Sequence, residues 1–237
     1  TIDIKKRRKP HPVPGFVKDS KWVIFPALSY KNHLKNENLQ QIIAQTFDHS
    51  IYNEIDGKGK AGIIAGGVSA AYAKEAINEL GLTKTVAFLK LGNPYPFPDG
   101  IAEYFLKGLD KILVLEELDA FLEEEFLALC GKRHLKVEVF GKYTGNMPQA
   151  GENSLEIIKK AIAHFLDVEY QPEPALALPD LPVRPPVLCA GCPHRGAFSA
   201  VKQAMKGREA VFTGDIGCYT LGNAKPLDMV DTCLCMG

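Results

Sequence analysis

The sequence predicts an α/β protein built on a parallel sheet. Apolar runs at residues 61–65, 85–91 and 111–116 are short enough to be strands and apolar enough to be buried on both faces of a sheet. A segment with helical periodicity follows each run, and a fourth strand at 136–140 and a helix at 154–166 continue the alternation. Strands that alternate with helices through short links form parallel sheets with helices on their faces.

The segments between these strands predict the covering elements. We expect helices over residues 34–51, 69–80, 101–109 and 120–129, a turn at 57–60, and a break at 93–98, where three prolines cannot join a ladder. Gly66-Gly67 follows the first strand, but the Gly-x-Gly-x-x-Gly spacing of a dinucleotide site is absent. The glycine pair therefore favours a tight strand-to-helix turn.

Composition excludes several functions. Of 237 residues, 46% are hydrophobic and 24% are charged, and the formal net charge is zero, so no overall field attracts nucleic acid or an anionic membrane. The basic run at residues 5–9 is flanked by prolines, which favours a solvated arm. No apolar run is long enough for a membrane span, and the N-terminus lacks the apolar core of a signal peptide. We expect a cytoplasmic, reducing location, where clustered cysteines are metal ligands or catalytic thiols more often than disulfides.

Four segments are expected along the chain. Residues 1–50 form a linker arm and a helix, 51–170 an α/β domain, 171–186 a proline-rich linker, and 187–237 the first part of a second α/β domain. In the second domain we expect a helix at 196–205, a strand at 210–213 and a loop at 214–217, on the ligand-binding edge of its sheet. No starting methionine is present, so we expect a piece of a longer polypeptide.

Five of the six cysteines lie within residues 189–237, which points to a metal or cofactor site. Cys189 and Cys192 form a Cys-x-x-Cys turn that suits half of a zinc site, a redox dithiol, or an iron–sulfur site that also uses Cys218. No strand–helix unit of the thioredoxin type precedes the turn, which weakens the redox interpretation. The spacing alone leaves zinc and iron–sulfur open.

Glu116 and Glu117 end the third strand, where open α/β sheets place ligands. Paired carboxylates there could be catalytic. Three further glutamates follow at residues 123–125, which favours a solvated acidic face.

Three motifs in the last part of the chain carry a resemblance. They are Leu188-Cys-Ala-Gly-Cys-Pro-His-Arg-Gly196, Gly214-Asp-Ile-Gly-Cys-Tyr-Thr-Leu-Gly222 and Asp231-Thr-Cys-Leu-Cys-Met-Gly237. In this order they resemble the thiamine-diphosphate domain of 2-oxoacid:ferredoxin oxidoreductases, above all the large (alpha) subunit of the indolepyruvate branch. Residues 61–166 are similar to the transketolase C-terminal-like domain that precedes it. The family's pyrimidine-binding domain, Gly-Asp-Gly motif and ferredoxin-like cysteines are missing from this sequence.

The resemblance implies a metal centre and a cofactor pocket. Three thiolates would hold a [4Fe–4S] cluster, namely those of Cys189, Cys192 and Cys218, with a fourth ligand from Cys233, from Cys235 or from beyond the sequence. Thiamine diphosphate with Mg²⁺ would lie against a loop made of Gly214, Asp215, Ile216 and Gly217. Met236 would support the bent cofactor, the alternative being a plain core methionine.

The resemblance also implies contacts for two residues beside the cysteine turn. His194 and Arg195 would meet the substrate carboxylate or the cofactor phosphate. The local alternative is that a turn carbonyl satisfies His194 and that an acidic side chain pairs with Arg195.

The implied activity is oxidative decarboxylation of an aryl 2-oxoacid such as indolepyruvate to an acyl-coenzyme A, with electrons passing to ferredoxin. The implied partners are a small beta subunit, ferredoxin, coenzyme A and the 2-oxoacid. We expect these 237 residues to be inactive alone. An alternative of a different class is a non-enzymatic zinc-binding module carried by an α/β scaffold.

Overall fold

The computed structural model describes residue 12, residues 15–172 and residues 179–234. It contains two compact units, Thr1–Glu173 and Pro174–Gly237, called unit 1 and unit 2 below. The division falls inside the proline-rich segment that was expected to be a linker.

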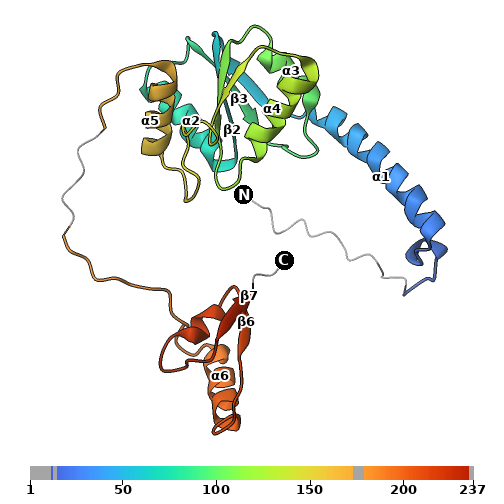
Figure 1. The fold of residues 1–237 in the computed structure, drawn as a ribbon, viewed down its shortest axis with the longest axis vertical. Helices are drawn as coiled ribbons and strands as arrows, with labels where there is room; N and C mark the ends of the chain where they lie inside the picture. Colours follow the sequence, from blue (N-terminus) through green and yellow to red (C-terminus); the bar gives the residue numbers. More distant parts are fainter. Residues whose placement is uncertain (1–11, 13–14, 173–178, 235–237) are drawn as a thin grey trace. The chain divides into compact units, whose positions relative to one another are not determined.

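Unit 1 alternates strands and helices after one long N-terminal helix (Figure 1). Its elements in chain order are η1 Ser20–Trp22, α1 Pro26–Phe47, β1 Glu54–Gly57, β2 Ala61–Gly66, α2 Gly67–Glu79, β3 Val86–Leu91, α3 Asp99–Leu106, β4 Lys111–Leu115, α4 Phe121–Arg133, β5 Glu138–Phe140 and α5 Leu155–Leu166.

The sheet of unit 1 has the strand order β1-β3-β2-β4-β5. Strands β3, β2, β4 and β5 are parallel, so the predicted α/β fold with a parallel sheet is confirmed. The edge strand β1 is antiparallel to β3, with Glu54 opposite Lys90, whereas the sequence predicts only a turn in this region. The apolar pattern misses this strand because Glu54-Ile-Asp-Gly57 is short and mostly polar, as an exposed edge strand can be.

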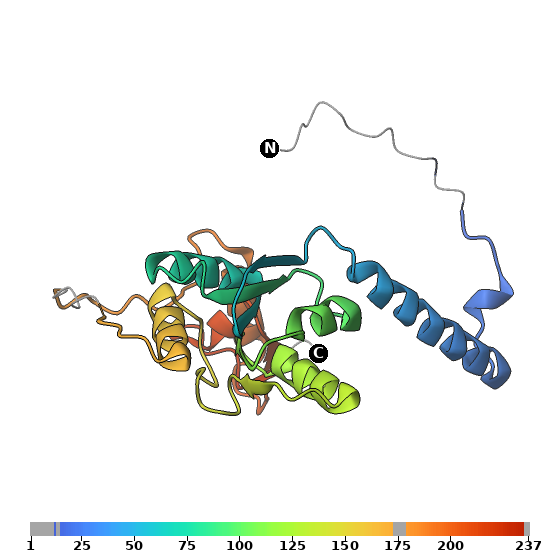
Figure 2. The same ribbon diagram turned by 90° about the horizontal axis from the view of Figure 1, so that it is seen from above.

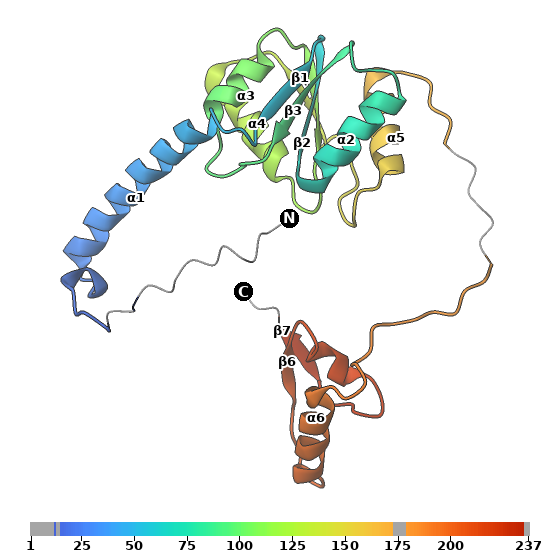
Figure 3. The same ribbon diagram turned by 180° about the vertical axis from the view of Figure 1, so that it is seen from behind.

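Helices cover both faces of this sheet. Helices α2 and α5 lie side by side on one face, where they bury Ala73, Ile158 and Ile162 against Ile63 of β2 (Figure 3). Helices α3 and α4 cover the other face, where Phe105 and Phe126 belong to the same buried cluster as Ile64 and Val114. Successive residues of a strand point to opposite faces, so the central strands must be apolar throughout, as they are.

Helix α1 departs from the expectation. It begins at Pro26, with proline in the first turn, and not at residue 34, and none of its residues is buried. Figure 2 shows it extending away from the sheet of unit 1. Its apolar stripe, including the exposed Leu39 and Ile42, therefore contacts no core within the described part of unit 1.

Unit 2 is smaller and has a thin core. Its elements are α6 Pro193–Ala204, β6 Thr213–Asp215, η2 Thr220–Asn223 and β7 Thr232–Leu234. Strands β6 and β7 pair in parallel, and Leu188, Phe198 and Met229 are its buried apolar residues. The expected strand at 210–213 is wrong in position. The observed strand β6 begins later, at Thr213, because Gly214 and Asp215 pair with β7. Helix α6 starts earlier than expected because Pro193 suits the first helical position.

No helix among the described residues is both long enough and apolar enough to cross a membrane.

The tight packing around Gly62 gives a first prediction. A Cβ atom added to Gly62 would lie 2.7 Å from Cδ1 of Leu109 and 3.0 Å from the ring of Phe105, both buried. We expect Gly62→Val to lower the free energy of unfolding by about 1–3 kcal/mol, because an overpacked core must shift. Urea unfolding followed by circular dichroism measures this change.

Gly131 in α4 is the control, since nothing lies within 4 Å of an added Cβ there. Gly131→Ala should leave stability unchanged or raise it by up to about 1 kcal/mol. Equal stability of wild type and Gly62→Val would show that the sheet is looser than described.

Candidate functional site

The Cys-x-x-Cys turn in unit 2 is held by backbone and side-chain hydrogen bonds. The amide of Cys192 donates to the carbonyl of Cys189 at 3.2 Å, and Cys192 is the N-cap residue of α6. Gly191 adopts a φ of +72° in this turn, a conformation that favours glycine. The two cysteines are thus held in one turn, with Cys189 exposed and Cys192 half-buried, and both thiols are free.

Arg195 supports this turn from the first turn of α6. Its Nε donates to the carbonyl of Cys189 at 3.1 Å, and a second guanidinium nitrogen donates to the carbonyl of Leu188. The expected local alternative, an acidic partner, is therefore wrong, because both partners are backbone carbonyls. Two of the arginine's five donors bind the cysteine turn, which fits a positioning role and leaves others for an external anion.

His194 faces an aromatic groove. Its ring meets that of Tyr219 edge-on at 5.0 Å, and Tyr219 also meets Phe198 edge-on at 5.7 Å. The groove holds about 290 Å³ and is also lined by Thr213 and Met229. Nδ1 of His194 lies 3.3 Å from Sγ of Cys192, so its neighbour is a thiol and not the turn carbonyl that was expected as the local alternative.

The glycine-rich segment begins within β6, directly after Thr213, which lines this groove. Gly214 and Asp215 lie within β6, whereas Ile216 and Gly217 form the turn after the strand, with Ile216 exposed and Gly217 at a φ of +128°. The hydroxyl of Thr220 donates to the carbonyl of Asp215 at 2.8 Å and lies 3.3 Å from Sγ of Cys233. Thr220 thereby ties the turn to the neighbouring strand β7.

The expected metal ligands do not converge. Cys218 is exposed in the turn after β6, and Cys233 is exposed in β7. Throughout residues 15–172 and 179–234, no three or more His, Cys, Asp or Glu side chains form a group that could hold a metal ion. The donor types suit iron or zinc, but their present arrangement is not that of a formed site. The ligand roles of Cys189, Cys192 and Cys218 therefore stay predictions.

Two predicted residues lie beyond the described structure, and one group of contacts at the site was not predicted. Met236 and Cys235 lie outside the described residues. The sequence does not predict the aromatic contact between Phe198 and Tyr219, and the one signal for it is that Tyr219 directly follows Cys218 in the glycine-rich motif.

In unit 1, the carboxylates at the end of β4 anchor other parts of the fold. Glu116 is 8% exposed and accepts hydrogen bonds from the amides of Leu122 at 2.7 Å and Glu123 at 2.9 Å, at the start of α4. Glu117 accepts from the amide of Asn153 at 2.7 Å. Glu123 is itself 1% exposed and accepts from the amide of Lys142, so the expected solvated acidic face is wrong for Glu116 and Glu123.

Burial raises the pKa of Glu116 above its ordinary value of 4.5, and the nearby charge of Glu123 acts in the same direction. The two amide hydrogen bonds oppose this rise, because they favour the ionised form. The Glu116 carboxylate already accepts hydrogen bonds from two amides of α4, and that of Glu117 accepts one from Asn153. This argues against a catalytic role for the pair.

Fold and site together define an α/β protein in which a small second unit presents free thiols on glycine-rich turns. Its relatives include indolepyruvate oxidoreductase subunit IorA of Methanothermobacter marburgensis, 36% identical over 240 residues, which are 97% of this chain and 38% of that protein. The same subunit of Methanothermobacter thermautotrophicus is 38% identical over 246 residues, 100% of this chain and 39% of that protein. The subunit of Pyrococcus horikoshii is 38% identical over 226 residues, 92% and 34% respectively.

The chain is thus a relative of the IorA subunits, and the resemblance predicted from the three motifs is confirmed. It spans about two fifths of the length of the first two relatives. No protein-family model matches it. A solved 2-oxoglutarate:ferredoxin oxidoreductase from Magnetococcus marinus is similar with a TM-score of 0.43 and 18% identity, over 59% of this chain and 23% of that one. That likeness is too weak to bear on fold or function.

The contacts of Arg195 predict a measurable loosening of the cysteine turn. We expect Arg195→Ala to speed hydrogen exchange of the Cys192 amide by about threefold to tenfold, because the turn loses two guanidinium hydrogen bonds, one exposed and one half-buried. Arg208→Ala is the matched control, since the Arg208 side chain makes no hydrogen bond within the described part of the chain. Unchanged exchange in Arg195→Ala would remove the positioning role.

The raised pKa of Glu116 predicts a pH dependence of stability. The folded protein holds this proton more tightly than the unfolded chain, so Glu116 contributes less stability as pH rises above 4.5. Glu116→Gln cannot ionise, so its free energy of unfolding should rise relative to that of wild type as pH increases above 4.5. Urea unfolding at several pH values tests this, with Glu75→Gln on the exposed side of α2 as control. A difference that is constant with pH would contradict it.

Proposed function

We propose that this chain forms part of the large subunit of a 2-oxoacid oxidoreductase that passes electrons to ferredoxin. The observation that carries the proposal is 36–38% identity to IorA subunits over nearly the whole chain. Unit 2 supports it, because four free thiols and a glycine-rich turn occur there within about fifty residues. Thiolates are the protein ligands that iron–sulfur clusters use.

The proposed substrate is an aryl 2-oxoacid such as indolepyruvate, which is oxidatively decarboxylated to an acyl-coenzyme A. The names of the relatives support indolepyruvate. The aromatic groove supports an aryl group, because the edges and faces of His194, Phe198 and Tyr219 suit a further flat ring. In this proposal His194 and a free donor of Arg195 meet the substrate carboxylate or a cofactor phosphate.

The proposed cofactors are thiamine diphosphate with Mg²⁺ and a [4Fe–4S] cluster. The residues proposed to lie against thiamine diphosphate are Gly214, Asp215, Ile216 and Gly217, at the carboxyl end of β6, where α/β sheets bind ligands. Met236 is proposed to support the cofactor. When bound, thiamine diphosphate supplies an electron sink for the loss of carbon dioxide, and the cluster accepts electrons.

The proposed cluster ligands are Cys189, Cys192 and Cys218. Two of them already share one turn that Arg195 braces, so the third must approach on cluster binding. The two units are proposed to be a transketolase C-terminal-like domain and part of the thiamine-diphosphate domain. Further proposed partners are a small beta subunit, ferredoxin and coenzyme A, in the cytoplasm.

Zinc binding without catalysis is the second candidate. It is favoured by the 3.3 Å approach of Nδ1 of His194 to Sγ of Cys192, since imidazole and thiolate are both zinc ligands. A scaffold function of this kind would need neither thiamine diphosphate nor ferredoxin.

Anaerobic reconstitution with ferrous iron and sulfide separates the two candidates. We expect a brown protein with about four iron ions per chain, and loss of colour and iron in Cys192→Ser. Cys130→Ser is the matched control, because Cys130 is a free cysteine buried in unit 1. A colourless chain that retains zinc through Cys192 would favour the scaffold, and iron uptake that is equal in Cys192→Ser and wild type would reject the proposed ligands.

A further inference from the structure

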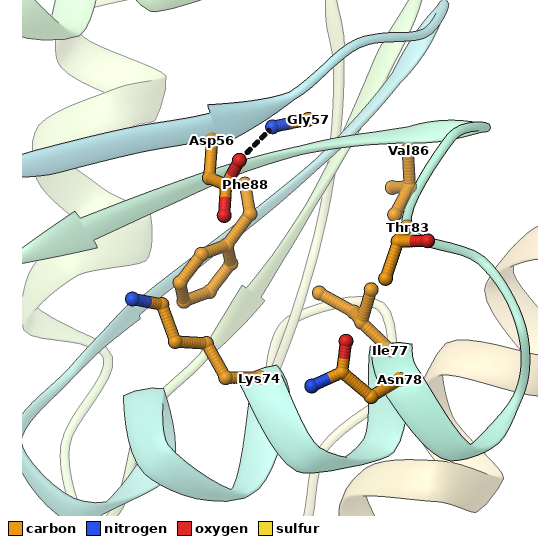
Figure 4. A pocket seen from close by; sticks show the side chains of 8 residues that line it. All are labelled: Asp56, Gly57, Lys74, Ile77, Asn78, Thr83, Val86 and Phe88. Atoms are coloured by element: carbon orange, nitrogen blue, oxygen red, sulfur yellow. Dashed lines mark hydrogen bonds between the residues drawn. The ribbon is translucent and has the colours of Figure 1, made fainter.

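A small cavity in unit 1 lies between the edge of the sheet and helix α2, away from the carboxyl ends of the central strands. It holds about 200 Å³, and its lining comes from β1, α2, the turn after α2, and the start of β3 (Figure 4). Sites for drug-sized ligands occupy about 300–1,000 Å³, so its ligand must be smaller.

The floor of this cavity is apolar and firmly packed. Val86, Phe88 and Ile77 line it and are 1%, 3% and 6% exposed. All three belong to the cluster that α2 buries against the sheet. The floor is therefore set by the core of unit 1 and offers a fixed surface to an apolar group.

One wall carries a carboxylate. Asp56 lies opposite Phe88 in the β1–β3 ladder, so both side chains lie on the face that α2 covers. One oxygen of Asp56 accepts from the amide of Gly57 at 2.7 Å, and within the described part of the chain this carboxylate makes no ion pair. Its second oxygen is available to an external cation.

The opposite wall carries an ammonium and an amide. Lys74 and Asn78 are four residues apart on α2, so they occupy neighbouring positions on one helix face. Lys74 donates to Glu54 at 2.8 Å, but Lys90 shares that same carboxylate at 2.6 Å, so two positive charges face one negative charge. The Asn78 side chain makes no hydrogen bond with the residues that the structure describes. Lys74 and Asn78 can therefore both donate to an external anion.

From this arrangement we propose that the cavity binds a free apolar α-amino acid. The ammonium group pairs with Asp56, the carboxylate accepts from Lys74 and Asn78, and the side chain lies on Phe88, Ile77 and Val86. A simple hydrocarbon would leave all three polar groups without a ligand partner. A dicarboxylate would place a negative charge beside Asp56, and a diamine would place a positive charge beside Lys74.

The expected affinity is weak. Both charged groups are solvent-exposed, and exposed ion pairs contribute little, so we expect a Kd on the order of 1 mM. An affinity in this range suits a response to the concentration of a free amino acid, and the cavity belongs to unit 1 whereas the cysteine turn belongs to unit 2.

Nuclear magnetic resonance titration of the ¹⁵N-labelled chain tests the proposal. L-leucine and L-phenylalanine, at about ten times a millimolar Kd, should shift the amides of Asp56, Lys74 and Asn78 in a saturable way. N-acetyl-L-leucine lacks the ammonium and L-leucinamide lacks the carboxylate, so each should bind at least about threefold more weakly, and D-leucine should also bind more weakly.

Variants supply the matched controls. Asp56→Asn and Lys74→Gln should each weaken binding by about threefold to fivefold. Glu75→Gln removes an exposed charge of the same helix that does not line the cavity, so its affinity should stay within about twofold of wild type. The proposal fails if neither amino acid shifts these amides, if the blocked compounds bind as well as L-leucine, or if Asp56→Asn binds as wild type does.

Discussion

The structure depends on burial of the central strands of unit 1 from both sides. Strands β2, β3 and β4 are apolar along nearly their whole length, and helices cover both of their faces. Ile63 and Ile64 are each 0% exposed although they point to opposite faces. Apolar burial on this scale is the main favourable term in folding, so the sheet fixes the positions of the strand ends and of the helices that begin there. Glu116 illustrates the consequence, since the end of β4 places its carboxylate on the amides of α4.

Unit 2 has far less of this support. Among its described residues three apolar ones are buried, and several large ones remain exposed, among them Val211, Ile216 and Leu234. Its turns are held mainly by polar contacts, such as those of Arg195 to Leu188 and Cys189. Contacts of this kind hold one turn but do not bring distant turns together. This accounts for a geometry in which Cys189 and Cys192 share a turn while Cys218 does not join them.

Apolar periodicity in the sequence predicted the central part of the fold well. The strands at β2, β3 and β4 and their helices are where the alternation of apolar runs placed them, because two-sided burial leaves a strong pattern. Features that depend on tertiary contacts were predicted poorly. Strand β1 is polar and is ordered by pairing with β3, and the start of β6 is set by pairing with β7. The burial of Glu116 and Glu123 could not be read from a run of acidic residues, since only the fold supplies their amide partners.

We propose that unit 1 is a self-supporting scaffold and that the turns of unit 2 would come together around a bound cluster. Residue-level hydrogen exchange before and after anaerobic cluster assembly tests this claim most directly. We expect amides of β2, β3 and β4 to exchange slowly in both states, and amides of residues 213–234 to exchange fast at first and much more slowly once iron and sulfide are bound. Slow exchange of unit 2 from the outset, or exchange there that cluster assembly leaves unchanged, would contradict the account.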